Sequence, residues 1–290
     1  MFLKRRKYPE LIEASAFMSL VCLIMVSTSL GTQKWTVGTA SVVDDVEDVD
    51  DSTINQGLLA GTLIRRILDS PKAYDIYLTC LLEENVCAWS CLADADAREE
   101  EVQRLFKGEI PQFNCAPVST SRISLSKFIP RDDNTTTITL TNGTYTGEFL
   151  NAGIFYGTLS AVIFTLMTLF LLFLLSVVNC VICPKDPILN TAGMVILANV
   201  ALAANLLGVI LYASNYGIWI KNNIGIRDTI VKEYESTVSL GYSFWLFTCT
   251  CFLTPLIPVY IFIRNHLLRK DRTEIVIVID NVNDPTTVLY

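Results

Sequence analysis

The chain has 290 residues, of which 51% are hydrophobic and only 18% are charged, and its net charge is −7. Its mean hydropathy of +0.43 is typical of a membrane protein. The acidic balance argues against nucleic-acid binding. The sequence also lacks a nucleophile elbow, a phosphate-binding glycine loop and a cluster of metal ligands. We therefore expect no enzymatic activity, no cofactor, no bound metal and no small-molecule substrate.

Four apolar stretches without a charged residue are long enough to cross about 30 Å of hydrocarbon, which takes about 20 residues. They are residues 14–31, 153–183, 192–213 and 238–263. This pattern predicts an all-α transmembrane four-helix bundle with a large, disulfide-stapled outer loop of mixed structure. Pro255 and Pro258 should kink the fourth helix. Asn199 and Asn205 are expected to form hydrogen bonds across the bundle, because an amide is costly against lipid.

Basic residues predict which segments face the cytosol. Residues 4–7 are all basic and precede the first apolar stretch, and a second basic group lies in residues 264–272, after the last stretch. Cytosolic segments carry an excess of lysine and arginine. Both termini, residues 1–13 and 264–290, should therefore be cytosolic, together with the short turn 184–191.

Residues 32–152 and 214–237 are then the two outer loops. The large loop holds both glycosylation signals of the chain, at Asn134 and Asn142, which indicates passage through the secretory pathway to the plasma membrane. A cleaved secretory signal peptide is the alternative interpretation of the basic cluster and the apolar run after it. The run is longer than a usual signal core, so we favour a retained helix.

Four cysteines of the large outer loop should form two disulfides, because this loop matures in an oxidising compartment. They are Cys80, Cys87, Cys91 and Cys115. Three connectivities are possible, and the sequence does not choose among them. A zinc site is the competing interpretation, but the only histidine of the chain, His266, lies in the cytosolic tail.

Two further cysteines, Cys180 and Cys183, lie at the predicted cytosolic end of the second span. Cysteines in this position are candidates for S-palmitoylation. A buried, inert thiol is the other interpretation.

Local patterns predict mixed structure in the outer loop. The spacing of apolar residues in 58–69 predicts a helix with Arg65 and Arg66 turned outward. Alternation around Asn142-Gly143 in residues 135–147 predicts a β-hairpin. The acidic runs 44–51 and 99–101 are interpreted as solvated surface, since neither has the spacing of a calcium loop.

Trp35 follows the first span in the stretch "LGTQKW", residues 30–35. We expect its ring to lie in the headgroup layer, where an indole can bury its face and keep its N–H hydrated. The stretch "YESTVSLGYSFW", residues 234–245, enters the fourth span from the same side. "NCVICPKDPILNTAGMVILAN", residues 179–199, joins the second and third spans by a short turn that contains proline.

The first two of these segments, 30–35 and 234–245, together resemble the clarins, four-span glycoproteins related to the claudin-like tetraspan group, and the turn in 179–199 supports the resemblance. The resemblance covers the first span and about residues 153–270, whereas the outer loop is longer than is usual for clarins. The motif residues are Gly31, Thr32, Trp35, Tyr242, Ser243, Phe244 and Trp245. The resemblance implies an organiser or adaptor of plasma-membrane domains and of actin-linked, sensory or synaptic assemblies. Its partners would be lipid and other membrane or scaffold proteins.

An auxiliary subunit of a membrane channel is the main alternative function, since other claudin-like tetraspans act in that way. A claudin-like junction protein is less favoured, because Trp35 lacks the W-x-G-L-W companion motif of claudins. Tetraspanins carry their large loop after the third span and a Cys-Cys-Gly motif, neither of which this sequence has.

The last seven residues of the sequence are "DPTTVLY". Val288 and Tyr290 form an apolar-x-apolar pattern that could add a strand to the edge of a PDZ-type domain. Such endings are also common by chance. The nearby run 274–280 is β-prone, and we expect a partner or the membrane surface to cover it.

Overall fold

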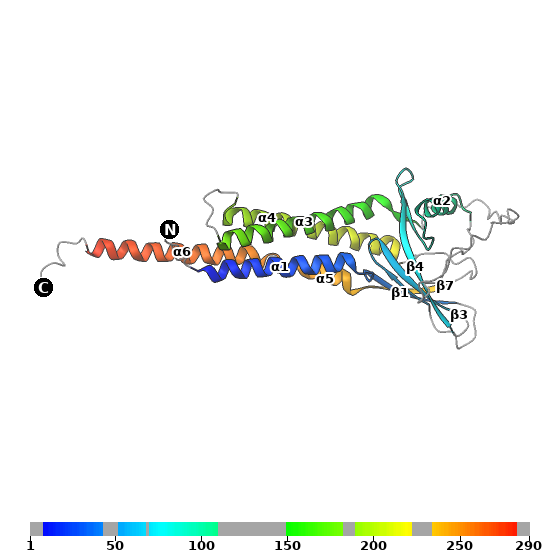
Figure 1. The fold of residues 1–290 in the computed structure, drawn as a ribbon, viewed down its shortest axis with the longest axis horizontal. Coiled ribbons are helices and arrows are strands. Elements are labelled where there is room, and N and C mark those ends of the chain that lie inside the picture. The colour runs from blue at the N-terminus through cyan, green and yellow to red at the C-terminus, as the bar shows by residue number, and fades with distance from the viewer. Residues whose placement is uncertain are drawn as a thin grey trace. The chain divides into compact units, whose positions relative to one another are not determined.

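The computed structural model describes residues 8–42, 52–67, 70–109, 149–181, 189–221 and 234–282. The order of its elements can be followed in Figure 1. The chain divides into two compact units. The helical unit comprises Met1–Ser27, Ala161–Leu206 and Phe247–Tyr290, and the sheet unit comprises Thr28–Ser160 and Leu207–Leu246.

Four helices are long and apolar enough to cross a membrane, which indicates a multi-pass membrane protein. The candidate spans are Pro9–Gly31, Ala152–Val181, Thr191–Ile220 and Tyr242–Asp271. The first two are α1 (Pro9–Gly31) and α3 (Ala152–Val181), and the third is α4 (Thr191–Asn215) followed by a π-helical turn, η1 (Tyr216–Ile220). The prediction of four membrane helices is thus confirmed by length and composition.

The fourth span is broken at proline. It consists of α5 (Tyr242–Leu253) and α6 (Leu256–Val282). Pro255 has no N–H to continue the first helix, so the helix stops there. Pro258 lies in the first turn of α6, where a missing N–H leaves no hydrogen bond unmade. The prolines therefore produce one break, rather than a kink at each.

The two ends of this span differ from the prediction. Residues 238–240, expected to open the span, belong to a strand, and the helix begins at Tyr242. Residues 274–280, expected to be β-prone, continue α6. A helix that is already nucleated extends at one hydrogen bond per residue, whereas a strand needs a partner.

Within the helical unit, polar side chains connect the spans at a few points. Asn205 donates a buried hydrogen bond from α4 to Thr250 of α5, as the sequence predicted. Asn199 instead donates to the carbonyl of Val195 in its own helix and is exposed, so that part of the prediction is wrong. Asn179 bonds the carbonyl of Leu189 at 2.7 Å and so joins the end of α3 to the start of α4.

The sheet unit corrects the all-α expectation, because it contains a seven-stranded antiparallel sheet in the order β6-β5-β4-β3-β2-β1-β7. The strands are β1 (Thr36–Val42), β2 (Ser52–Gln56), β3 (Ala60–Ile67), β4 (Ser70–Leu81), β5 (Val86–Ser90), β6 (Leu150–Asn151) and β7 (Tyr234–Leu240). Strand β7, which precedes the fourth span, pairs with β1, which follows the first.

Residues 60–67 of the predicted helix 58–69 form strand β3. It is hydrogen-bonded on both sides, with Ile64 opposite Thr53 of β2 and Ala73 of β4. A β-carbon on Gly61 would lie less than 3.0 Å from the carbonyl oxygen of Asn55, so close strand pairing uses the glycine. Short apolar runs fit helical and strand periods alike, and pairing with neighbouring strands decides between them.

One helix, α2 (Ala95–Phe106), packs on β4 and β5. Asp94 caps it by accepting a hydrogen bond from the N–H of Ala97. The guanidinium of Arg98 lies 4.8 Å from the ring centre of Tyr77. Ser90 donates a hydrogen bond to the Glu101 carboxylate, and burial raises the pKa of Glu101 despite that bond.

Candidate functional site at the base of the sheet

The sheet unit brings the two motif segments together at one end of the sheet, which we call the base of the sheet. There β1 leaves α1, β7 enters α5 and β6 enters α3. Thr36 is paired with Leu240 in the ladder. Gly241 donates its N–H to the carbonyl of Trp35 at 2.8 Å, and the N–H of Ser243 bonds the carbonyl of Lys34 at 3.1 Å. The motif residues are therefore neighbours across about 200 residues of sequence.

Trp35 is fully buried, with 0% of its surface exposed. Its indole N–H donates to the carbonyl of Ser29 in the last turn of α1 at 2.7 Å. Its ring lies 4.7 Å from that of Tyr212 and 6.3 Å from that of Phe244. The expectation that the Trp35 N–H stays hydrated is wrong, because a carbonyl left free at the end of α1 takes the place of water.

Buried hydroxyl groups complete this junction. Ser29 donates to the carbonyl of Ser243 at 2.7 Å, and the hydroxyls of Thr32 and Ser243 share a hydrogen bond of 2.7 Å. Thr36 and Tyr212 share another of 2.6 Å. Each such bond is worth about 1 kcal/mol net, and an unpaired buried partner costs more. These neutral side chains join the end of α1 to the start of α5, and α4 to the first strand.

The glycines of the junction differ in how closely other atoms surround them. A β-carbon on Gly241 would overlap the carbonyl oxygen of Lys34, and one on Gly57 would lie 2.5 Å from that of Ala60. Both positions therefore need glycine. Nothing lies within 4 Å of a β-carbon on Gly31, so packing does not explain this motif glycine.

Two other motif residues, unlike Trp35, are exposed where α5 begins. Tyr242 and Trp245 begin α5 and are 49% and 54% exposed. Aromatic residues at the end of a span favour the headgroup layer.

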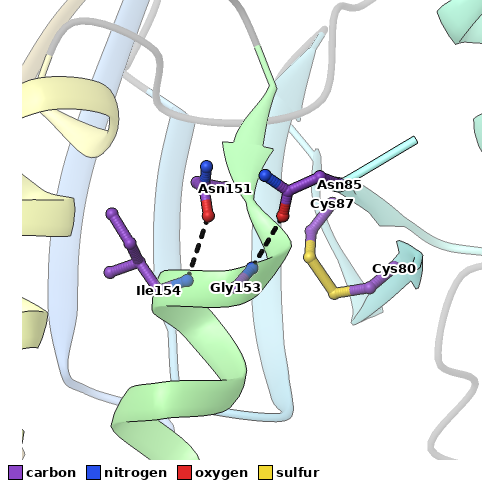
Figure 2. Close-up of a disulfide and its surroundings, with 6 residues drawn as sticks. All are labelled: Cys80, Asn85, Cys87, Asn151, Gly153 and Ile154. Atoms are coloured by element: carbon purple, nitrogen blue, oxygen red, sulfur yellow. Dashed lines mark hydrogen bonds between the residues drawn. A yellow bond between two sulfur atoms is a disulfide. The ribbon is translucent and has the colours of Figure 1, made fainter. Parts of the chain in front are cut away.

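A second connection at the base of the sheet holds the first turn of α3. The β4–β5 turn places Asn85 with its side-chain oxygen 2.9 Å from the N–H of Gly153, and Asn151 accepts from the N–H of Ile154 at 3.0 Å. Figure 2 shows both amide oxygens directed at this turn. The carbonyl of Asn85 also accepts from the N–H of Ala152. Three N–H groups that a helix start leaves free are thus satisfied.

A disulfide between Cys80 and Cys87 closes the β4–β5 hairpin beside this cap (Figure 2). It confirms one of the predicted bridges. Cys91 is also disulfide-bonded, and Cys115 lies outside the described residues.

The remaining predicted site residues are placed only in part. Cys180 is half-buried at the end of α3. Cys183, the glycosylation candidates Asn134 and Asn142, and the tail residues Val288 and Tyr290 lie outside the described residues. In the part of the chain that the structure describes, no group of three or more His, Cys, Asp or Glu residues could hold a metal ion.

No protein-family model matches this chain, and no curated protein matches it.

Sequence reasoning missed Tyr212, Gly241 and Asn85. Tyr212 lies near the outer end of the third span, where a tyrosine suggests only an interfacial residue. Asn85 had a usable signal in its residue type, because asparagine is favoured in tight turns and tolerates the positive φ of 55° that it adopts here. The stretch "LEEN" between two β-prone runs is typical of such a turn.

Proposed function

We propose that this chain is a non-enzymatic, four-pass membrane glycoprotein that organises assemblies at the plasma membrane, as the resemblance to clarins implies. The observation that carries the proposal is the meeting of the two resembling segments through the Gly241–Trp35 hydrogen bond. The resemblance rested on two pieces of sequence about 200 residues apart. A shared structural role at the base of the sheet gives a physical reason for both.

The chemistry of the junction supports an organising role. Ser29, Thr32 and Ser243 use their hydroxyls on one another and on backbone carbonyls. Such a network joins the end of α1 to the start of α5, beside the ladder that pairs β1 with β7 in one sheet. A sheet fixed to the ends of the spans can present a constant surface to adhesion partners on the outer side of the membrane.

Recovery of partners from cells tests this proposal. The tagged full-length protein is purified in mild detergent, and proteins present in stoichiometric amount are identified. We expect adhesion, scaffold or actin-linked proteins. A stoichiometric channel would favour the auxiliary-subunit alternative and overturn the organiser.

A matched pair of variants makes the experiment specific. Gly241→Ala should disrupt the junction, whereas Gly31→Ala, with nothing within 4 Å of the new β-carbon, should leave it intact. At equal surface level, partners that recognise the outer sheet should be lost only from the Gly241 variant. Equal loss from both variants would show that capture does not depend on the sheet.

A further inference from the structure

Two hairpin turns at the base of the sheet each carry a pair of leucines, one buried and one exposed. In the β2–β3 turn Leu58 is 2% exposed and Leu59 is 55% exposed. At the β4–β5 turn Leu81 is 6% exposed and Leu82 is 72% exposed. Among the described side chains of residues 52–109, Leu59 and Leu82 are the only large apolar ones that stand exposed.

One turn is bonded to the first turn of α3, and the strand that leads into the other is bonded to the segment that follows α1. Gln56, at the end of β2, accepts the N–H of Trp35 at 2.9 Å, four residues after α1 ends. Asn85 accepts the N–H of Gly153 at 2.9 Å in the first turn of α3. The turn that carries Leu82 closes on the same asparagine, whose N–H bonds the carbonyl of Leu82 at 3.3 Å.

Exposed aromatic residues on the neighbouring helices indicate that the two turns lie at the edge of the hydrocarbon. Tyr156, exposed on α3, lies three residues beyond Gly153, which is about 4.5 Å along a helix. The exposed Tyr242 and Trp245 begin α5 beside Gly241. Two N–H groups in the first turn of α3 bond asparagine side chains. This agrees with a position at the edge of the hydrocarbon, because N–H groups near lipid need partners within the protein.

We propose that Leu59 and Leu82 insert into the headgroup region of the leaflet on the sheet side, so that the two turns anchor the sheet on the membrane surface. The charge near Leu82 specifies the lipid. Glu83 and Glu84 are exposed beside it, and these carboxylates repel anionic headgroups. The β4–β5 turn therefore fits a zwitterionic, phosphatidylcholine-type surface. Lys34 is exposed near the β2–β3 turn. Repulsion of anionic headgroups is therefore expected only at the turn that carries Leu82.

Fluorescence quenching in nanodiscs tests the insertion. The full-length protein carries one dansylalanine, introduced by stop-codon suppression at residue 59 or 82, and is reconstituted as a single copy in phosphatidylcholine discs. Gln103, exposed on α2, serves as the aqueous control site, and Leu174, exposed within α3, as the lipid control site. An unchanged thermal transition shows that each labelled protein is folded.

We expect probes at residues 59 and 82 to emit at shorter wavelength than the probe at 103. Nitroxides on the lipid headgroup should quench them more than nitroxides deep in the acyl chain, with the reverse order at 174, and aqueous iodide should quench the probe at 103 most. Iodide quenching at 59 and 82 equal to that at 103 would overturn the proposal. Blue-shifted emission without lipid quenching would also overturn it, because it would show a protein surface covering the leucines.

The charge of the lipid provides a separate arm. Replacing part of the phosphatidylcholine by phosphatidylglycerol should reduce headgroup quenching at residue 82. The Glu83→Gln/Glu84→Gln variant should abolish this reduction. Equal quenching in both lipids would overturn the assignment of a zwitterionic surface.

Discussion

The carbonyl oxygen of Lys34 lies less than 3.0 Å from the position that a β-carbon on Gly241 would occupy. The strand that enters the fourth span therefore crosses the end of the first span in backbone-to-backbone contact. No side chain fits at residue 241. The need for glycine there is imposed by a segment about 200 residues earlier in the sequence.

Replacing Gly241 by alanine should force the two segments apart and destabilise the sheet unit by at least about 1–3 kcal/mol, as overpacking does in other proteins. The measurement is the thermal transition of the purified protein, together with its surface level in cells. Gly31→Ala should leave both unchanged. Equal effects of the two substitutions would contradict the close contact.

Removing the Tyr212 hydroxyl should leave the buried Thr36 hydroxyl without its 2.6 Å partner. We expect Tyr212→Phe to cost about 1–3 kcal/mol of stability, because an unpaired buried donor carries a desolvation penalty. Thr36→Val should have a similar effect. The double variant should lose less than the sum of the two, and strict additivity in this cycle would show that the groups do not interact.

Loss of the Cys80–Cys87 bridge should loosen the hairpin that caps α3. A cross-link between residues separated by seven positions restricts the unfolded chain by about 2–3 kcal/mol. The Cys80→Ala/Cys87→Ala variant should melt at lower temperature and reach the surface in smaller amount. Cys180→Ser, which removes a cysteine outside the hairpin, should do neither. Mass spectrometry of unreduced peptides checks the bridge directly.

Glu101 should make stability depend on pH. Burial raises its pKa above the ordinary value of 4.5, so the folded protein keeps a proton that the unfolded chain releases. Stability contributed by this group therefore falls as the pH rises from about 4.5 through the raised pKa. Glu101→Gln should flatten this decline and stabilise the protein at neutral pH. Glu100→Gln, on an exposed residue paired with Arg104, should leave the decline in place.

Glycosylation tests the membrane orientation on which the proposed function depends. Glycosidase treatment should increase gel mobility, and Asn134→Gln with Asn142→Gln should remove that shift. An N-terminal tag should persist in the mature protein and require permeabilised cells for detection. Loss of the tag would favour the signal-peptide alternative.

The sequence predicted the membrane helices well because a span is a local property. A run such as residues 153–183 is long and apolar by itself, and hydrocarbon thickness sets the length that it needs. The break at Pro255 is equally local, since it follows from one missing N–H. The Cys80–Cys87 bridge was predicted as one of several pairings, and only the β4–β5 register, which sets these residues opposite each other, selects it.

The sheet and the place of Trp35 were decided by tertiary structure. Residues 60–67 fit a helical period, but β2 and β4 offer hydrogen bonds on both sides and make them a strand. Trp35 has an aromatic ring and one N–H that the headgroup layer would satisfy. Tyr212, Phe244 and the carbonyl of Ser29 satisfy them in the interior instead. The sequence alone determined which segments avoid water, because that preference belongs to each residue, whereas the pairing of strands and the burial of one ring depend on partners that only the folded chain brings together.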